Sequence, residues 1–191
     1  MADAFRLFAQ PWWVNLLVLV PLLSFYFWRR SGLAIARLTL AIAAAFGIAF
    51  GFVEAAVVVY LRAAVGLFPG RGGAPDYAPA LQDIPQNLFD IEVLREAATI
   101  IMLVSIALLA ARRARERWAM FLYIFALWDL AYYAGLRATV GWPPSLLADD
   151  ILFLIPVPWI SNVWYPLLVS GLTVFAVVFA TGIGQSRHAD A

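Results

Sequence analysis

Four acidic residues lie inside stretches of sequence that are otherwise apolar. Glu54 interrupts "GFVEAAVVVY", and Asp129 stands between a tryptophan and two tyrosines in "FALWDLAYYAGLR". Glu92 and Glu96 are four residues apart in "IEVLREAAT", a spacing that puts both on one face of a helix. A charged side chain at the centre of a bilayer costs at least about 2.5 kcal/mol, so such residues usually have a purpose and a partner. These carboxyl groups are the first candidates for a functional site.

Arginine and aromatic residues near the four acids are candidate partners for them. Arg95 lies between the two glutamates of the third stretch, and Arg62 follows Glu54 by about two helical turns. Tyr132 and Tyr133 follow Asp129 by one turn, and Trp128 directly precedes it. We expect these side chains to bind a ligand or carry protons together with the acids.

A stripe of small residues precedes Glu54 at helical spacing. Ala43, Gly47, Gly51 and Ala55 recur every fourth residue. Such stripes let two helix backbones approach closely inside a membrane. Because Glu54 borders this packed face, we expect its side chain to point into a helix bundle.

Several kinds of site fit the same residues. Carboxylate oxygens alone suit Mg²⁺, Ca²⁺ or Mn²⁺, with Glu54, Glu92, Glu96 and Asp129 as the expected ligands. A proton relay would use the same carboxyl groups without a metal, and a lipid or quinone headgroup could bind against the aromatic residues. The structural alternative is a set of ion pairs that only hold helices together. Four carboxyl groups against two guanidinium groups leave two negative charges, which favours a bound partner or protonation.

The residues that the chain lacks exclude whole classes of chemistry. It has no cysteine, which excludes disulfides, iron–sulfur ligation and thiol catalysis. All of its basic residues are arginines, so no lysine is present to form a Schiff base. The single histidine, His188, lies close to the C-terminus, and we therefore expect no haem and no Ser-His-Asp triad.

The overall composition is that of an integral membrane protein. Of the 191 residues, 64% are hydrophobic and only 13% are charged, and the mean hydropathy is +0.86. A soluble domain has about 25% charged residues and could not bury so much apolar surface. The net charge of +1 gives no reason to expect a nucleic-acid partner. The expected solvent is the lipid bilayer.

We expect one all-α domain over residues 1–191 with five membrane-spanning helices. A proline at position 21 is expected to kink the first of them. The second is longer than the roughly 20 residues that a bilayer requires, so it should tilt or project. The expected spans cover residues 12–28, 33–68, 91–111, 118–136 and 159–183.

The distribution of arginines predicts the orientation of these spans. Arg29 and Arg30 follow the first span, and "RRARER" at 112–117 joins the third to the fourth. The loops 69–90 and 137–158 are mainly acidic. Because arginine-rich loops stay cytoplasmic, we expect the N-terminus outside, the C-terminus inside and the acids open to the outside. The expected location is a bacterial inner membrane.

The two expected outer loops differ in kind. Loop 69–90 is rich in proline and glycine and should be irregular. Loop 137–158 contains an apolar run too short to span a membrane, and we expect a short interfacial or re-entrant helix there. Asp149 or Asp150 would cap this helix at one end and Ser145 at the other. An interfacial aromatic belt is expected from Trp142, Trp159 and Trp164.

The sequence thus predicts an outward-facing site of carboxylates, arginines and tyrosines inside the membrane. It would handle a cation, a proton or an amphipathic small molecule, by transport or by binding. Glu54 and Asp129 would be its deep groups, and Glu92 and Glu96 its entrance. One alternative is a non-catalytic subunit of a larger membrane complex or a homo-oligomer, and another is a lipid-modifying enzyme with a carboxylate-bound metal.

Overall fold

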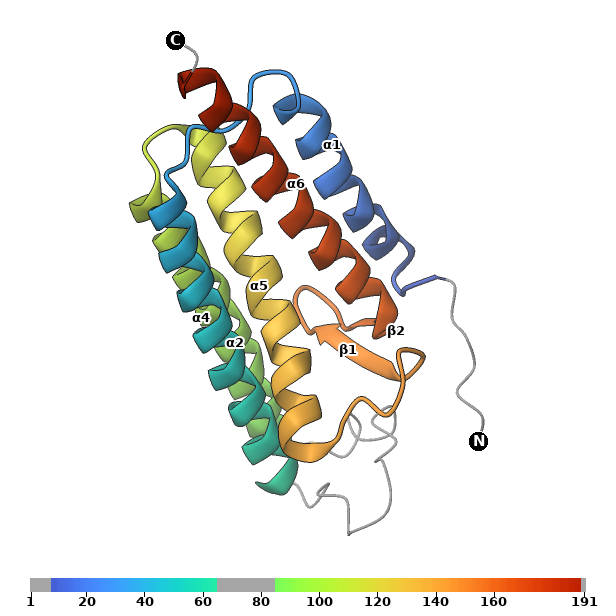
Figure 1. Cartoon of the computed structure of the whole chain (residues 1–191). Helices are drawn as coiled ribbons and strands as arrows, with labels where there is room; N and C mark the ends of the chain where they lie inside the picture. Colours follow the sequence, from blue (N-terminus) through green and yellow to red (C-terminus); the bar gives the residue numbers. More distant parts are fainter. Residues whose placement is uncertain (1–7, 65–84, 190–191) are drawn as a thin grey trace.

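The computed structural model of the protein describes residues 8–64 and 85–189. The chain is mostly helical (75%), as expected from the sequence. Figure 1 shows long helices side by side and a small hairpin of strands between two of them. The helices are η1 (Trp12–Val18, a 3-10 helix), α1 (Leu19–Trp28), α2 (Arg37–Ala64), α4 (Gln86–Ala110), α5 (Ala114–Val140) and α6 (Trp164–Ala189), and the strands are β1 (Asp149–Phe153) and β2 (Trp159–Asn162).

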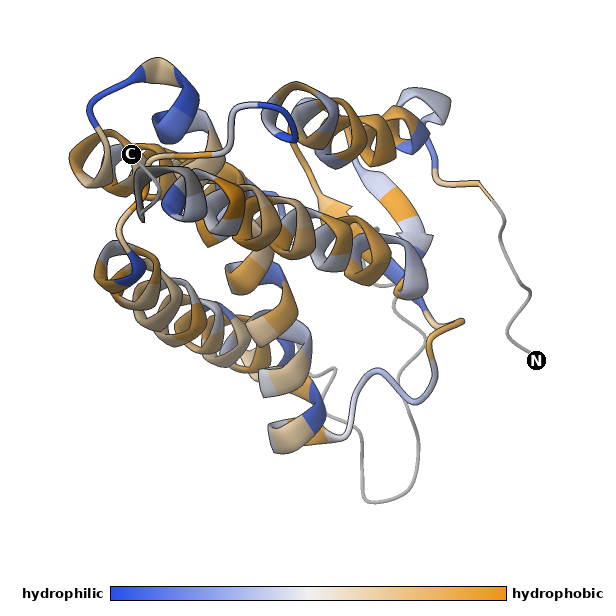
Figure 2. Cartoon of the chain, turned by 45° about the horizontal axis from the view of Figure 1, so that its top comes forward, coloured by the Kyte–Doolittle hydropathy of each residue, from blue (hydrophilic) through white to orange (hydrophobic). Residues whose placement is uncertain are grey.

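Four of the described helices, α2, α4, α5 and α6, are long and apolar enough to cross a membrane. Hydrophobic residues run along the helices, and hydrophilic ones gather at helix ends and connections (Figure 2). Large apolar side chains such as Ile101, Leu109 and Phe175 are exposed on these helices, as expected for surfaces that face lipid. α5 is much more buried than the other three, so it is the central helix of the bundle.

The first apolar segment, 12–28, is built from two kinds of helix. Residues 12–18 form the 3-10 helix η1, which passes directly into α1. The change of helix type falls just before Pro21, which lies in the first turn of α1. The kink expected at Pro21 stays a prediction.

The stripe of small residues joins α2 to α5, as the sequence predicts. Ala43, Gly47, Gly51 and Ala55 are buried on α2 together with Glu54. A Cβ atom added at Gly51 would lie 2.3 Å from the carbonyl oxygen of Trp128, so the two backbones are too close for any side chain there. This close contact sets the position of α2 along its axis relative to the part of α5 that carries Trp128 and Asp129.

The short helix expected within 137–158 is wrong, because the structure has an antiparallel hairpin there. β1 pairs with β2 in a register that places Asp149 opposite Asn162 and Ile151 opposite Ile160. Prolines at 156 and 158 leave too few residues for a stable helix, whereas a strand ladder satisfies the backbone groups of the apolar residues. The fifth apolar segment consequently starts its helix at Trp164 rather than at residue 159.

Other expected boundaries also change, and α2 begins at Arg37 rather than at residue 33. α4 begins at Gln86, directly after Pro85, so the last residues of the expected loop 69–90 are helical; residues 65–84 lie outside the described part. α5 is longer than expected at both ends and stops at Gly141, whose φ of 72° is in the left-handed region. A glycine in this conformation is a common helix terminator.

The connections of the bundle lie at two opposite ends. The α1–α2 and α4–α5 connections lie at the same end as the C-terminal end of α6, whereas the hairpin lies toward the other end, beside α5 and α6 (Figure 1). The arginine-rich segments of the sequence thus share one end of the molecule.

We predict that Gly51→Ala and Gly171→Ala change stability in opposite directions. Alanine at 51 forces α2 away from α5 and should cost about 1–3 kcal/mol. An added Cβ at Gly171 meets nothing within 4 Å, and alanine there should stabilise α6 by up to about 1 kcal/mol. Thermal unfolding of the detergent-purified variants measures both, and an unchanged Tm for Gly51→Ala would contradict the close approach of α2 and α5.

Candidate functional site

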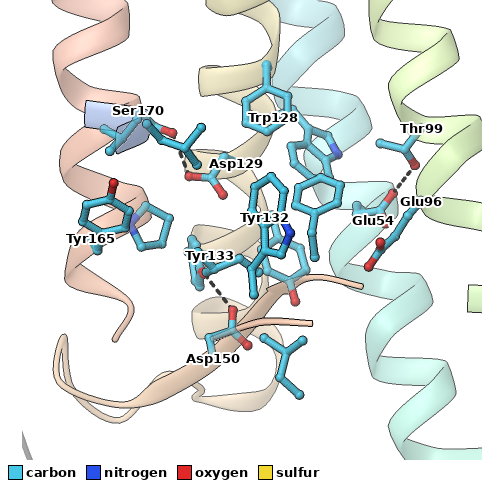
Figure 3. Close-up of a pocket in the computed structure, with 18 of the residues that line it drawn as sticks. Glu54, Glu96, Thr99, Trp128, Asp129, Tyr132, Tyr133, Asp150, Tyr165 and Ser170 are labelled. Carbon is cyan, nitrogen blue, oxygen red and sulfur yellow. Dashed lines mark hydrogen bonds between the residues drawn. The ribbon is translucent and has the colours of Figure 1, made fainter. Parts of the chain in front are cut away.

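Acidic side chains from four elements line one cavity of about 110 Å³. All four acids singled out in the sequence lie there, together with one acid from the hairpin and one arginine. Figure 3 labels four of the five acids, Glu54, Glu96, Asp129 and Asp150. We call this space the acidic cavity. Its charged lining residues are Glu54, Glu92, Glu96, Asp129, Asp150 and Arg95.

Arg95 joins two of these acids into an ion-paired triad. Its Nε donates to Glu92 Oε2 at 2.9 Å and its Nη2 to Glu92 Oε1 at 2.5 Å. Its Nη1 contacts Glu54 on α2, and the hydroxyl of Thr99 donates to Glu54 Oε2 at 3.3 Å. At this wall of the cavity the structural interpretation is supported, because the triad ties α2 to α4.

The other two spanning acids have no arginine partner within ion-pair distance in the described part of the chain. Asp129 Oδ2 accepts a hydrogen bond of 2.8 Å from the hydroxyl of Ser170 on α6. The Glu96 carboxylate accepts the backbone N–H of Leu154, at 2.8 Å for the nearer oxygen. Asp129 is half-buried and lines the cavity, so it can accept further hydrogen bonds there.

Asp150 belongs to the cavity and caps no helix, which corrects the expectation for it. It lies on β1, is 6% exposed, and accepts a hydrogen bond of 2.7 Å from the hydroxyl of Tyr133 on α5. Burial raises the pKa of Asp150 to about 6, against the opposing effects of the Tyr133 hydrogen bond, the charge of Arg62 and the N–H of Ile151.

Neighbouring polar residues of the hairpin and the turn before it have local roles. Asp149 accepts a hydrogen bond of 2.8 Å from the side-chain amide of Asn162 on the paired strand. The hydroxyl of Ser145 accepts from the N–H of Leu147 at 3.2 Å, within a turn rather than at a helix end.

An aromatic wall covers one side of the acidic cavity. Its neighbouring rings have centroids between 5.3 and 6.3 Å apart. The hairpin supplies two of the five members and α5 supplies three. They are Phe125, Trp128, Tyr132, Phe153 and Trp159, and all of them line the cavity.

A second, larger cavity of about 510 Å³ adjoins the first. Apart from two hydroxyl residues and two tryptophans its lining is apolar, and it comes from η1, α1, α4, α5, α6 and the hairpin. We call it the apolar cavity. Six residues line both spaces: Leu17, Phe125, Phe153, Trp159, Val169 and Ser170. Because Ser170 is the partner of Asp129, this hydrogen-bonded pair lies at the junction of the two cavities.

Arg62 and the belt tryptophans lie differently from what the sequence suggests. Arg62 does not line the acidic cavity; its guanidinium lies 4.7 Å from the ring centroid of Trp142. Trp142 itself is buried among protein residues and Trp159 lines both cavities. Trp164 is half-buried at the start of α6.

Three polar residues of the acidic cavity were not predicted from the sequence. Thr99, Ser170 and Tyr165 line the acidic cavity, and single hydroxyl residues in apolar helices carry no distinctive pattern. Among the described residues, no three acidic or histidine side chains are arranged to hold a metal ion. The divalent-cation site expected from Glu54, Glu92, Glu96 and Asp129 stays a prediction, which elemental analysis of the purified protein tests.

Comparison with known proteins assigns no family to the chain. No protein-family model, no curated protein and no solved structure matches it. We therefore infer function from the geometry of the two cavities.

We predict that Arg95→Leu destabilises the protein and that neutral partners restore it. The variant leaves Glu54, which is 4% exposed, without its cation, and breaking such a pair costs about 3–5 kcal/mol. Adding Glu54→Gln and Glu92→Gln should recover most of the lost Tm. A triple variant as unstable as Arg95→Leu would show that the guanidinium matters for packing rather than for charge.

We predict that the raised pKa of Asp150 makes the folded protein less stable as the pH rises. Its pKa in the folded protein, about 6, lies above the ordinary value of 3.8. Between these two pH values the folded state holds a proton that the unfolded state releases, so stability falls as pH rises from about 4 to about 6. The Tm of the wild type minus that of Asp150→Asn should shrink across this window. Asp90→Asn, at an exposed carboxyl, is the control, and parallel wild-type and Asp150→Asn curves would contradict the prediction.

Proposed function

We propose that this multi-pass membrane protein binds an amphipathic small molecule within the membrane. The polar end of the molecule would occupy the acidic cavity, and its apolar part the apolar cavity. The observation that carries the proposal is the shared wall of the two spaces, which six residues line from both sides. A molecule that fills both spaces has to be polar at one end and apolar along the rest.

The size and lining of the apolar cavity favour an amphipathic ligand over a lone ion or proton. Its lining includes Ile101 and Trp118, whose side chains are 66% and 46% exposed, so this space opens toward the lipid and an apolar chain can enter it from the membrane. A site for a cation or proton alone would need only the acidic cavity of about 110 Å³. A chain or ring system fits the space of about 510 Å³ and would pack against its apolar lining.

The polar residues divide into two groups under this proposal. Glu54, Glu92 and Arg95 pair with one another and hold α2 to α4, which is the role that a structural ion pair predicts. Asp129 and Ser170 stand at the junction of the cavities. They are the groups that a ligand reaching in from the apolar side meets first.

We further propose five membrane crossings, with the N-terminus outside and the C-terminus cytoplasmic. The segment 12–28 has only 17 residues, but a 3-10 helix rises about 2.0 Å per residue. Seven such residues and ten α-helical ones reach about 29 Å, close to the thickness of the hydrocarbon core. The arginine-bearing connections lie at one end of the bundle and the hairpin toward the other (Figure 1), which supports placing the acidic cavity in the outer half of the membrane.

We predict that filling the apolar cavity weakens ligand binding. Ala97 lines that cavity and is half-buried on α4, whereas the next residue, Ala98, is exposed. Ala97→Phe should weaken the binding of a twelve-carbon amphiphile at least about tenfold, because a phenyl ring removes the space for the chain, and Ala98→Phe should bind like the wild type. The probes are dodecan-1-ol, dodecylamine and dodecanoic acid, measured by equilibrium dialysis on protein in lipid nanodiscs.

The variants are compared with the probe that binds the wild-type protein most tightly. Saturable binding that Ala97→Phe loses and Ala98→Phe keeps supports the proposal. No saturable binding of any probe, or equal binding by both variants, would overturn it.

A further inference from the structure

The junction of the two cavities combines one carboxyl group with several aromatic rings. The carboxylate of Asp129 turns toward Ser170 on α6, its hydrogen-bond partner, which lines both spaces (Figure 3). Three members of the aromatic wall, Phe125, Phe153 and Trp159, also line both. The ring centroid of Phe153 is 6.1 Å from that of Phe125 and 5.5 Å from that of Trp159. A ligand that passes from one cavity into the other therefore meets this set of side chains.

The charged groups around the junction are mainly acidic. Five carboxyl groups and one guanidinium line the acidic cavity. That guanidinium belongs to Arg95, which contacts Glu54 and Glu92, and in the described part of the chain no arginine lies within ion-pair distance of Asp129. Coulomb attraction is stronger inside a protein than in water, so this lining attracts a cation and repels an anion.

The aromatic rings favour one class of cation. The face of an aromatic ring attracts an organic cation that lies within about 6 Å of its centroid, and proteins use groups of rings to bind ammonium ions. A hard metal ion instead needs several oxygen ligands around one point, and among the described residues no three acidic or histidine side chains are so arranged. One carboxyl group beside three rings therefore fits an ammonium group better than a metal ion.

We infer that the polar end of the ligand is an ammonium group that pairs with Asp129 among the three rings shared by the two cavities. The ligand is then a cationic amphiphile, such as a long-chain amine. This inference rests on the proposed binding of an amphipathic molecule and names its polar end. A chain that fills the space of about 510 Å³ ends at the junction, which is where the negative charge of Asp129 complements it.

The test compares probes that share a twelve-carbon chain and differ at the polar end. Dodecylamine, dodecyltrimethylammonium, dodecan-1-ol and dodecanoic acid are each measured by equilibrium dialysis against the protein in nanodiscs of phosphatidylcholine, which has no net charge. At pH 8 the amine is protonated and the acid is ionised, and empty nanodiscs give the partitioning into lipid that is subtracted. Both cations should bind at least about tenfold more tightly than the alcohol, and the acid most weakly.

Asp129→Asn tests the position of the charge. The amide keeps the size of the side chain and an oxygen that accepts from Ser170, but it carries no negative charge. The preference for the amine over the alcohol should fall to about twofold or less. Asp90→Asn is the matched control, because Asp90 is exposed on α4 and lines neither cavity, and it should keep the preference of the wild type.

Phe153→Leu tests the contribution of the rings and does not depend on the folding of Asp129→Asn. Leucine keeps the site apolar and removes one aromatic face, so the preference for the amine over the alcohol should fall about threefold. Phe175→Leu is the matched control, because Phe175 is exposed and lines neither cavity.

The outcomes distinguish this inference from the function on which it rests. Cations that bind tightest, with a preference that both variants lower and both controls keep, support it. Binding of the alcohol or the acid that equals or exceeds that of the cations would overturn the ammonium assignment and leave amphiphile binding intact. A preference for the amine that neither Asp129→Asn nor Phe153→Leu lowers would overturn its place at the junction. Absence of saturable binding by all four probes would overturn both proposals.

Discussion

Every polar group that the chain places inside the bundle has to find its partner there, because lipid offers none. This constraint organises the structure around the acidic cavity. Several contacts of these acids join two elements: Arg95 and Glu54 join α4 to α2, and Ser170 and Asp129 join α6 to α5. The carboxyl groups are thus both the lining of the site and the connections between its walls.

The hairpin is attached by the same means. Glu96 on α4 accepts the N–H of Leu154, just after β1, and Asp150 on β1 accepts the hydroxyl of Tyr133 on α5. Once held there, the hairpin brings Phe153 and Trp159 into the wall that both cavities share. A strand pair can lie beside spanning helices because its ladder and these side chains satisfy its backbone groups.

The charged groups of the acidic cavity are not all paired to the same extent. Its triad pairs one guanidinium, that of Arg95, with the two carboxyl groups of Glu54 and Glu92, and it is explained by helix packing. Asp129, on the central helix, accepts one hydrogen bond from a side chain in the described part of the protein, that of Ser170. Ser170 also lines the apolar cavity, so the proposed ligand would meet this hydrogen-bonded pair where the two cavities join.

The sequence by itself determined the membrane class, the apolar helices and the acids that would lie deep among them. These follow from local properties: composition, the length of apolar runs and the i, i+4 stripe that seats Gly51 against α5. It did not reveal the hairpin, since "ILFLI" is equally apolar as a helix or a strand and only pairing with residues 159–162 decides between them. Nor could it select Ser170 or Thr99 from the other hydroxyl residues, because they meet acids 41 and 45 residues away in the chain. The tertiary structure alone decided those partners and the adjoining cavities, since both arise from contacts between elements far apart in sequence.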